Sequence, residues 1–324
     1  MRPLPADEPP QRLRVLIDAA LAAAFALVVL GGVVRVSDSG LGCGAAGAGL
    51  HGWPLCRGGL VPSGQLHTIL EYSHRFLATA LVLLLLAVLW TALRGGRGRP
   101  MMLWAAIAAL ALIVPQALLG ALTVEKGLSP GLVAAHLAVA MLLLGVLVAM
   151  AMAARGRLGG ERGSPRLRAL ALIACGLLLA TITAGGLVAG TERHGTPGEE
   201  QAPGAHMACG PDFPSCNGAF LPYGESEMVD IQLAHRTAMF AAVAAIAALA
   251  AALGRAGRGG LALALIYALG AQVGLGALIV WAGESALLVL AHLTMASLLW
   301  LLVIGAAAQL WFGSASESAP AWAR

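Results

Sequence analysis

The chain has 324 residues, of which 59% are hydrophobic and 11% are charged. A soluble domain of this size carries roughly 25% charged residues, so the composition excludes an ordinary soluble protein. The formal net charge is +4, but no nucleic-acid-binding motif accompanies it. We therefore expect no nucleic-acid partner, and we attribute the positive charge to the arrangement of the chain in a membrane.

Apolar runs long enough to cross a bilayer, roughly 20 residues each, recur along the chain. They predict eight transmembrane helices, at about 14–36, 67–93, 101–124, 131–154, 167–190, 229–253, 259–282 and 286–312. The first run is too long for the apolar segment of a cleaved signal peptide, and further spans follow it, so we expect it to remain as the first span. The predicted fold class is an all-α polytopic membrane protein.

Arginine is concentrated in alternate loops of this predicted arrangement. The loops between spans 2 and 3, 4 and 5, and 6 and 7 carry Arg94, Arg97, Arg99, Arg155, Arg157, Arg162, Arg166, Arg168, Arg255 and Arg258. The opposite loops are longer, yet they carry only Arg35, Arg57, Lys126 and Arg193. The positive-inside rule therefore places both termini in the cytoplasm. The composition, almost free of lysine and rich in Arg, Ala and Gly, suggests a prokaryotic plasma membrane.

The sequence repeats itself after about half its length. Residues 116–124 read QALLGALTV and residues 272–280 read QVGLGALIV, and the same shift carries His136 onto His292. Upstream, Trp-Pro-Leu-Cys at 53–56 matches Phe-Pro-Ser-Cys at 213–216. Each half has an even number of spans, so a pseudo-two-fold axis along the membrane normal is expected to relate the halves. We predict two tandem four-helix bundles, 1–154 and 167–324, joined by a cytoplasmic linker at 155–166.

Four of the five cysteines form two pairs in predicted outer loops. Cys43 and Cys56 share the first outer loop, and Cys209 and Cys216 share the third. Paired cysteines on the oxidising side of a membrane favour disulfides. A zinc site is the alternative, although no C-x-x-C spacing supports it. Cys175, alone in the fifth span, is expected to be a small core residue.

Four histidines occupy matched places, His74 and His136 in the first half and His235 and His292 in the second. Each lies near the outer end of a predicted span, so the members of a pair share a depth. An imidazole inside a bilayer usually marks a functional site, and neutral imidazole binds haem iron well. Four-helix bundles commonly place such cofactors between facing helices. We predict two bis-histidine metal or haem sites; structural hydrogen bonding and a proton pathway are the alternatives.

Other polar residues near these pairs are weaker candidates. The histidines without repeat partners are expected to be solvated loop residues, with weak metal contact as the alternative: His51, His67, His194 and His206. Arg75 and Arg236 each follow a paired histidine at the interface. Because a guanidinium group matches a carboxylate, they are candidates for haem propionates, or else arginines that extend to the interface.

The halves differ at one informative position. Glu71 precedes His74 by three residues and shares its helix face, whereas Gln232 stands at the equivalent place before His235. A carboxyl group can exchange protons during an oxidation, and an electron-transfer site needs no such group. We therefore interpret the first half as the substrate half and the second as the cofactor half. A structural pairing with Arg75, or with the helix start, is the alternative.

Several motifs resemble the signature of the haem A synthase family: GGVVR at 31–35, SGL at 39–41, WPLC at 53–56 and EYSHR at 71–75. The second half, with AHR at 234–236 and AH at 291–292, is similar to that family's C-terminal repeat. The resemblance covers all eight spans. It implies an oxidoreductase that oxidises the C8 methyl of haem O to the formyl group of haem A, for biogenesis of aa3-type terminal oxidases.

The resemblance also implies roles for particular residues. Haem O would lie between His74 and His136, and a haem b cofactor between His235 and His292. Glu71 matches the family's essential acidic residue. Cys43 and Cys56 match the family's pair of outer-loop cysteines, which would either relay redox equivalents or hold the loop in place.

Three other functions remain open on the sequence: a bis-histidine b-type cytochrome for electron transfer, a haem carrier, and a secondary transporter. A transporter would have helices broken near mid-membrane, whereas the polar signals here lie at helix ends. The expected partners are haem O and the lipid bilayer, with haem O synthase, oxidase assembly factors and a second copy of the chain as further candidates.

Overall fold

The computed structural model describes residues 9–62, 64–94, 100–159, 161–192 and 204–313. Four of the residues expected in loops, Arg97, Arg99, Arg193 and His194, lie outside this part of the chain. Everything below concerns the described residues.

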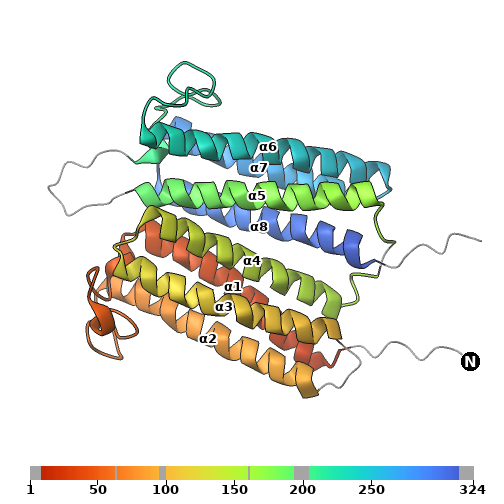
Figure 1. Cartoon of the computed structure of the whole chain (residues 1–324), viewed down its shortest axis with the longest axis horizontal. Coiled ribbons are helices and arrows are strands. Elements are labelled where there is room, and N and C mark those ends of the chain that lie inside the picture. The colour runs from red at the N-terminus through yellow and green to blue at the C-terminus, as the bar shows by residue number, and fades with distance from the viewer. Residues whose placement is uncertain (1–8, 63, 95–99, 160, 193–203, 314–324) are drawn as a thin grey trace, which may run out of the picture.

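Eight long helices make up the structure (Figure 1). They are α1 (Gln11–Val36), α2 (Leu66–Arg94), α3 (Pro100–Glu125), α4 (Pro130–Ala154), α5 (Pro165–Thr191), α6 (Glu227–Arg255), α7 (Gly259–Ala282) and α8 (Ala286–Phe312). All eight are long and apolar enough to cross a membrane. No β-strand occurs in the described residues; three short 3-10 helices, η1 (Ser39–Leu41), η2 (Gly49–His51) and η3 (Ala205–Met207), lie in the loops. The prediction of an all-α polytopic protein is confirmed, with boundaries close to those expected.

Local sequence explains where several helices begin. Ser164, Ser226 and Ser285 precede α5, α6 and α8, and each hydroxyl accepts a hydrogen bond from the backbone N–H three residues later. Such a cap satisfies one of the N–H groups that a helix start leaves without a partner. Proline opens α4 and α5, where its missing N–H costs nothing.

The helices pack as two groups of four, which we call the first half (α1–α4) and the second half (α5–α8). Within each half, every helix contacts its sequence neighbours and the first contacts the last. Figure 1 shows the second half lying along the first. Between the halves, α4 contacts α5 and α8, and α1 contacts α8. A pseudo-two-fold axis would produce this reciprocal pattern; the axis and the boundaries of the two predicted units stay predictions.

Glycine permits the close contact between the halves. A Cβ atom at Gly32 of α1 would lie 2.7 Å from the Leu293 side chain of α8, and one at Gly186 of α5 would lie 3.2 Å from the Cα of Ala134 of α4. Real Cβ atoms are not found at the first of these distances, and the second is tight against backbone. The second glycine of each repeated Gly-Gly pair therefore serves the junction between the halves.

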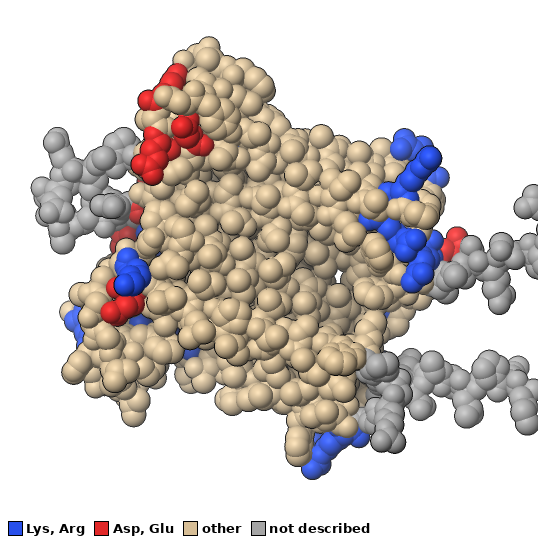
Figure 2. Space-filling view, viewed as in Figure 1, with Lys and Arg blue, Asp and Glu red and all other residues tan. Residues whose placement is uncertain are grey.

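Charge is unevenly distributed along the bundle. On the face seen in Figure 2, Lys and Arg side chains gather mainly at one end and acidic side chains mainly at the other. The acidic end carries the long loops between α1 and α2 and between α5 and α6, and we call it the loop end.

Candidate functional site

A cavity of about 580 Å³ lies within the bundle and is lined by residues from all eight helices. Most of its lining is apolar. The polar exceptions include all four paired histidines together with Glu71, Arg75 and Arg236. The structure thus brings together, in one cavity, the histidines, carboxylate and arginines that the sequence singled out.

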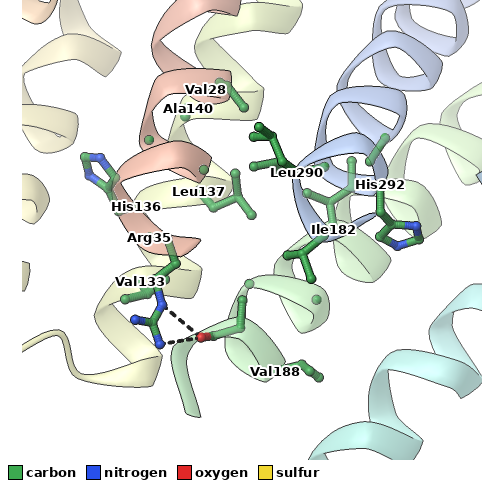
Figure 3. A pocket seen from close by; sticks show the side chains of 18 of the residues that line it. Val28, Arg35, Val133, His136, Leu137, Ala140, Ile182, Val188, Leu290 and His292 are labelled. Carbon is green, nitrogen blue, oxygen red and sulfur yellow. Dashed lines mark hydrogen bonds between the residues drawn. The ribbon is translucent and has the colours of Figure 1, made fainter. Parts of the chain in front are cut away.

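The four histidines form two pairs along this cavity. His74 lies close enough to His136 for their charges to interact, and the same holds for His235 and His292. Figure 3 shows His136 and His292 on opposite sides of a group of apolar side chains that includes Leu137 and Leu290. We call the lobe with His74 and His136 the first lobe and the lobe with His235 and His292 the second lobe.

Every paired histidine lies against a glycine of the preceding helix. The pairs are Gly31 with His74, Gly120 with His136, Gly185 with His235, and Gly276 with His292. A Cβ atom at any of these glycines would lie 3.0 to 3.4 Å from the nearest ring atom. Any larger residue would crowd the imidazole, so the glycines keep open the space in which the rings lie. In each Gly-Gly pair, the first glycine leaves space for a histidine ring, and the second allows close packing between the two halves.

The histidines of α2 and α6 are held by backbone. The Nδ1 of His235 donates to the carbonyl of Thr181 at 3.0 Å. His74 hydrogen-bonds to the backbone of Leu27, which occupies the matching position on α1. Thr181 and Leu27 each precede the facing glycine by four residues, which is about one helical turn. With Nδ1 engaged, Nε2 is the nitrogen of His235 that can bind a metal.

The histidines of α4 and α8 are held by glutamine side chains, which the sequence reasoning missed. The Nε2 of Gln116 lies 3.1 Å from the Nε2 of His136, and the Nε2 of Gln272 lies 3.1 Å from the Nε2 of His292. Both glutamines line the cavity. The repeat held the signal, because these residues open the matching segments QALLGALTV and QVGLGALIV.

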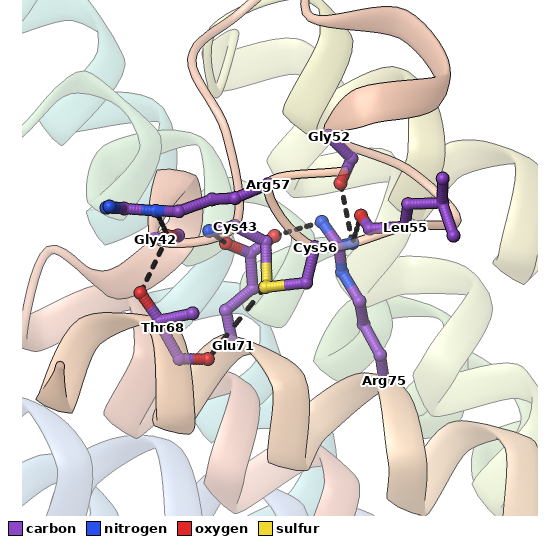
Figure 4. The surroundings of a disulfide bond; sticks show 9 residues. All are labelled: Gly42, Cys43, Gly52, Leu55, Cys56, Arg57, Thr68, Glu71 and Arg75. Atoms are coloured by element: carbon purple, nitrogen blue, oxygen red, sulfur yellow. Dashed lines mark hydrogen bonds and ion pairs between the residues drawn. A yellow bond between two sulfur atoms is a disulfide. The ribbon is translucent and has the colours of Figure 1, made fainter. Parts of the chain in front are cut away.

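Glu71 is buried, with 4% of its surface exposed. One carboxylate oxygen accepts the backbone N–H of Cys43 at 2.7 Å, and the other pairs with Arg75 one turn along α2 (Figure 4). In the second half, Gln232 donates to the carbonyl of His206 at 3.4 Å. The sequence difference at this position is therefore also a difference in contacts: the first half has a carboxylate paired with an arginine here, and the second half has a neutral amide.

Both predicted disulfides are present, Cys43–Cys56 and Cys209–Cys216. The two loops fold alike around them. Each second cysteine forms an antiparallel bridge with a residue three positions later, Gly59 in one loop and Ala219 in the other. Each Pro of the matched Trp-Pro and Phe-Pro pairs follows a cis peptide bond. The repeat therefore extends from the helices into the cysteine loops.

The arginine after each α2 or α6 histidine holds the cysteine loop of its half. Arg75 donates to the carbonyls of Gly52 and Leu55 at 2.6 and 3.0 Å, and Arg236 donates to the carbonyl of Ser215. Leu55 and Ser215 each immediately precede the second cysteine. The remaining nitrogens differ: Nη2 of Arg75 binds Glu71, whereas Nη2 of Arg236 is buried and has no partner within the described residues.

His206 contradicts the expectation that it is a solvated loop residue. It lines the cavity, and its Nδ1 lies 3.0 Å from a Glu192 oxygen and 3.2 Å from a Glu284 oxygen. Burial lowers its pKa, but the hydrogen bonds to the two carboxylates outweigh burial and raise the pKa to about 9. The sequence could not show this, because the three residues come from the position just after α5, from η3 and from the turn before α8.

Arg35 joins this cluster to the first half. Its guanidinium, on α1, donates to the carbonyls of Ala189 and Glu192 at the end of α5 (Figure 3). Together with the imidazolium of His206, it balances the charges of Glu192 and Glu284. The potential ligand atoms of Glu192, His206 and Glu284 lie within 4.8 Å of one another.

His51, His67 and Cys175 agree with the roles expected of them from the sequence. His51 and His67 are exposed, although His67 also bonds to Ser39. Cys175 carries a free thiol and packs against the apolar core.

Comparisons with known proteins place the chain in a family. It matches the family described as "Cytochrome oxidase assembly protein" over residues 63–304. It is 32% identical over 225 residues to the Heme A synthase of Halalkalibacterium halodurans, a match covering 65% of this chain and 66% of that protein. For the Heme A synthase of Bacillus licheniformis, the identity is 37% over 121 residues, or 37% of this chain and 38% of the relative.

A third relative, the Heme A synthase of Alkalihalophilus pseudofirmus, is 31% identical over 206 residues, which is 60% of this chain and 62% of the relative. The chain therefore matches less than two thirds of the length of these relatives. The family match itself covers most of the chain and includes Glu71 and all four paired histidines. The chain is a multi-pass membrane protein, and it belongs to the cytochrome oxidase assembly protein family.

Proposed function

We propose that this protein is a haem A synthase, a membrane oxidoreductase that oxidises the C8 methyl of haem O to the formyl group of haem A. In this proposal His74 and His136 hold haem O in the first lobe, and His235 and His292 hold haem b in the second. Family membership and the names of the relatives support it. The observation that carries it is the pair of matched histidine–glycine lobes, which differ in having the carboxylate of Glu71 in the first and the amide of Gln232 at the matching position of the second.

The residues of the two lobes fit a haem. A planar macrocycle between two histidines needs rings that face the lobe and helices that leave them space, and the four glycines provide that space. It also needs donors for its propionates, and Nη2 of Arg236, which is buried and has no partner in the described part of the chain, is such a donor. When bound, haem b supplies electron transfer, and haem O is the substrate whose methyl is oxidised.

The protein's own groups in the first lobe suit an oxidation. Glu71 is the ionisable group of that lobe and can hold or release a proton near the substrate. Arg75 balances its charge and fastens the Cys43–Cys56 loop. That loop would keep water from the lobe. In this arrangement the disulfide holds in place the backbone N–H that Glu71 accepts.

We further propose that the loop end faces outward from a prokaryotic plasma membrane and that both termini are cytoplasmic. The concentration of arginine at the opposite end supports this orientation, and the two disulfides at the loop end suit an oxidising compartment. The proposed partners follow from the pathway: haem O synthase would supply the substrate, and oxidase assembly factors would receive the product.

The test is to identify the haems in membranes that contain this protein together with a source of haem O. We expect haem A with the wild type and no haem A with His74→Ala, because that variant lacks a ligand in the substrate lobe. Unmodified haem b as the sole haem, whatever the supply of haem O, would contradict the proposal and favour an electron-transfer cytochrome.

A further inference from the structure

The residues that line the cavity are exposed in the first half and covered in the second. Four of the described lining residues are exposed, and all four belong to the first half: Trp53, Pro54, Thr79 and Ala117. Trp53 and Pro54 lie in the cysteine loop, whereas Thr79 lies on α2 and Ala117 on α3. Every described lining residue of the second half is buried or half-buried. The cavity therefore reaches the surface through the first lobe.

The exposed positions on the helices lie inside the membrane-spanning part of the bundle. Thr79 follows His74 by five residues on α2, and Ala117 precedes Gly120, which faces His136, by three residues on α3. Both therefore lie about one helical turn deeper than the paired histidines. Large apolar side chains on the same two helices are also exposed: Phe76, Leu83, Val114 and Leu118. Such a surface suits contact with lipid chains, which are as apolar as leucine.

The repeat places larger residues at the matching positions of the second half. The matched pairs, with the residue of the first half given first, are Ala78 and Met239, Thr79 and Phe240, Ala117 and Val273, and Thr123 and Ile279. We call the opening of the first lobe that is lined by Ala78, Thr79, Ala117 and Thr123 the α2–α3 cleft. The size difference does not extend all around the lobes, because the buried Leu81 of α2 matches the smaller Ala242 of α6. It is found at the positions that border the cleft.

Aromatic contacts cover the second lobe on the corresponding side. The rings of Phe220, in the cysteine loop, and Phe240, on α6, have centroids 5.7 Å apart. Phe213 of the same loop contacts Trp281 of α7 edge to face, with centroids 6.1 Å apart. The loop is thus packed onto both α6 and α7, which also pack against each other more extensively than α2 and α3 do. The first-half residues that match Phe220 and Phe240 are aliphatic or polar, and both are exposed: Leu60 and Thr79.

We propose that the α2–α3 cleft holds the isoprenoid tail of haem O and makes the first lobe selective for this substrate. This inference rests on the proposed function and adds the residues that determine specificity. Haem O carries a long isoprenoid chain that haem b lacks. A cleft beside the macrocycle, lined by small residues and continuous with the lipid-facing surface, gives that chain a path between α2 and α3. The covered second lobe suits haem b, which has no chain to accommodate.

The experiment uses the full chain, purified in detergent with its resident haem b, and titrated separately with haem O and with additional haem b. The double variant Thr79→Phe/Ala117→Val fills the cleft with the residues of the second half. Thr91→Phe/Ala111→Val is the matched control on the same helices, because neither residue lines the cavity. The hydroxyls of Thr79 and Thr91 make the same bond to the carbonyl four residues earlier. The readouts are the dissociation constant of each added haem and the amount of resident haem b.

We expect the wild type to bind haem O more tightly than additional haem b. Filling the cleft should weaken haem O binding at least roughly tenfold, which is the effect of exposing about two methylene groups to water. The affinity for additional haem b and the content of resident haem b should stay at the wild-type level. The control variant should bind both haems as the wild type does.

Two results would overturn the inference while the proposed function stands. One is a wild type that forms haem A but binds haem O and additional haem b equally well, since the tail would then make no contact. The other is a filled variant that binds haem O as tightly as the wild type, which would make the cleft a lipid-filled depression. A wild type that neither binds haem O nor forms haem A would refute the proposed function itself. If the double variant loses its resident haem b through misfolding, the single variant Ala117→Val is judged by the same two affinities.

Discussion

The first and second lobes are built from the same parts, and the comparison between them locates the proposed chemistry. Each has two histidines, two facing glycines, a glutamine beside one ring, a disulfide-closed loop and an arginine that fastens that loop. The difference lies at Glu71 and Gln232. In the first lobe the carboxylate binds the arginine; in the second lobe Nη2 of the arginine has no hydrogen-bond partner among the residues that the structure describes.

One substitution thus changes two properties of a lobe. A carboxylate gives the first lobe a group that can exchange protons, and it occupies the arginine that could otherwise bind an anionic group. A neutral amide leaves the second lobe without a proton-exchanging group at this position but with a guanidinium nitrogen available for a carboxylate. Two lobes with the same fold and one different residue, Glu71 or Gln232, would allow a duplicated unit to hold a cofactor in one lobe and a substrate in the other.

The largest expected effect comes from making the first lobe like the second. Glu71→Gln removes the carboxylate, and we expect haem A formation to fall by about 10²–10⁴-fold, the usual contribution of a positioned acid or base. Haem b should remain bound, because the second lobe is unchanged. Haem extraction and pigment analysis measure both quantities.

The reverse change, Gln232→Glu, is the matched control for that experiment. It should not increase haem A formation, since the proposal places the cofactor, and not the substrate, in the second lobe. Full haem A formation in Glu71→Gln would contradict the proposed role of Glu71.

A smaller effect is expected from filling the space beside one ring. Gly185→Val should displace His235, because a Cβ there already lies 3.0 Å from the ring. Overpacking costs about 1–3 kcal/mol, so haem b retention should weaken roughly 10- to 100-fold. Gly176→Val on the same helix is the control, since no atom lies within 4 Å of a Cβ at Gly176. Equal haem retention in the two variants would show that the glycine does not shape the site.

The smallest effect concerns the His206 cluster at the loop end. The two carboxylates beside it raise the pKa of His206 from the ordinary histidine value of about 6.5 to about 9, so protonation stabilises the folded state. That contribution is fully present below about pH 6.5 and is lost as the pH rises through about 9. Thermal unfolding at pH 6 to 10 should therefore show a larger loss of stability for the wild type than for His206→Gln. Parallel curves for the two proteins would contradict the ion pairing of His206.

Much of the fold could be predicted because it depends on composition. The eight apolar runs gave helices with nearly the expected ends, since helix length follows bilayer thickness. The cysteine pairs could be predicted because each pair shares one short loop, and the histidine pairs because the repeat aligns them.

The contacts of the site could not be predicted to the same extent. The Gly-Gly repeat was visible in the sequence, but only the packing shows that one glycine faces a histidine and the next faces the other half. His206 and Glu192 lie in the connection between α5 and α6, whereas Glu284 lies between α7 and α8, so no local pattern encodes their contact. Gln116 and Gln272 stood in the repeat, but an amide in an apolar segment has no distinctive chemistry until the neighbouring ring is placed.

The most direct test of the difference between the lobes is the haem content of the purified protein produced without haem O. We expect the wild type and His74→Ala to contain haem b, and His235→Ala to contain little or none. This result would assign the resident cofactor to the second lobe and leave the first for substrate. Equal loss of haem b in His74→Ala and His235→Ala would contradict the division of labour between the two lobes.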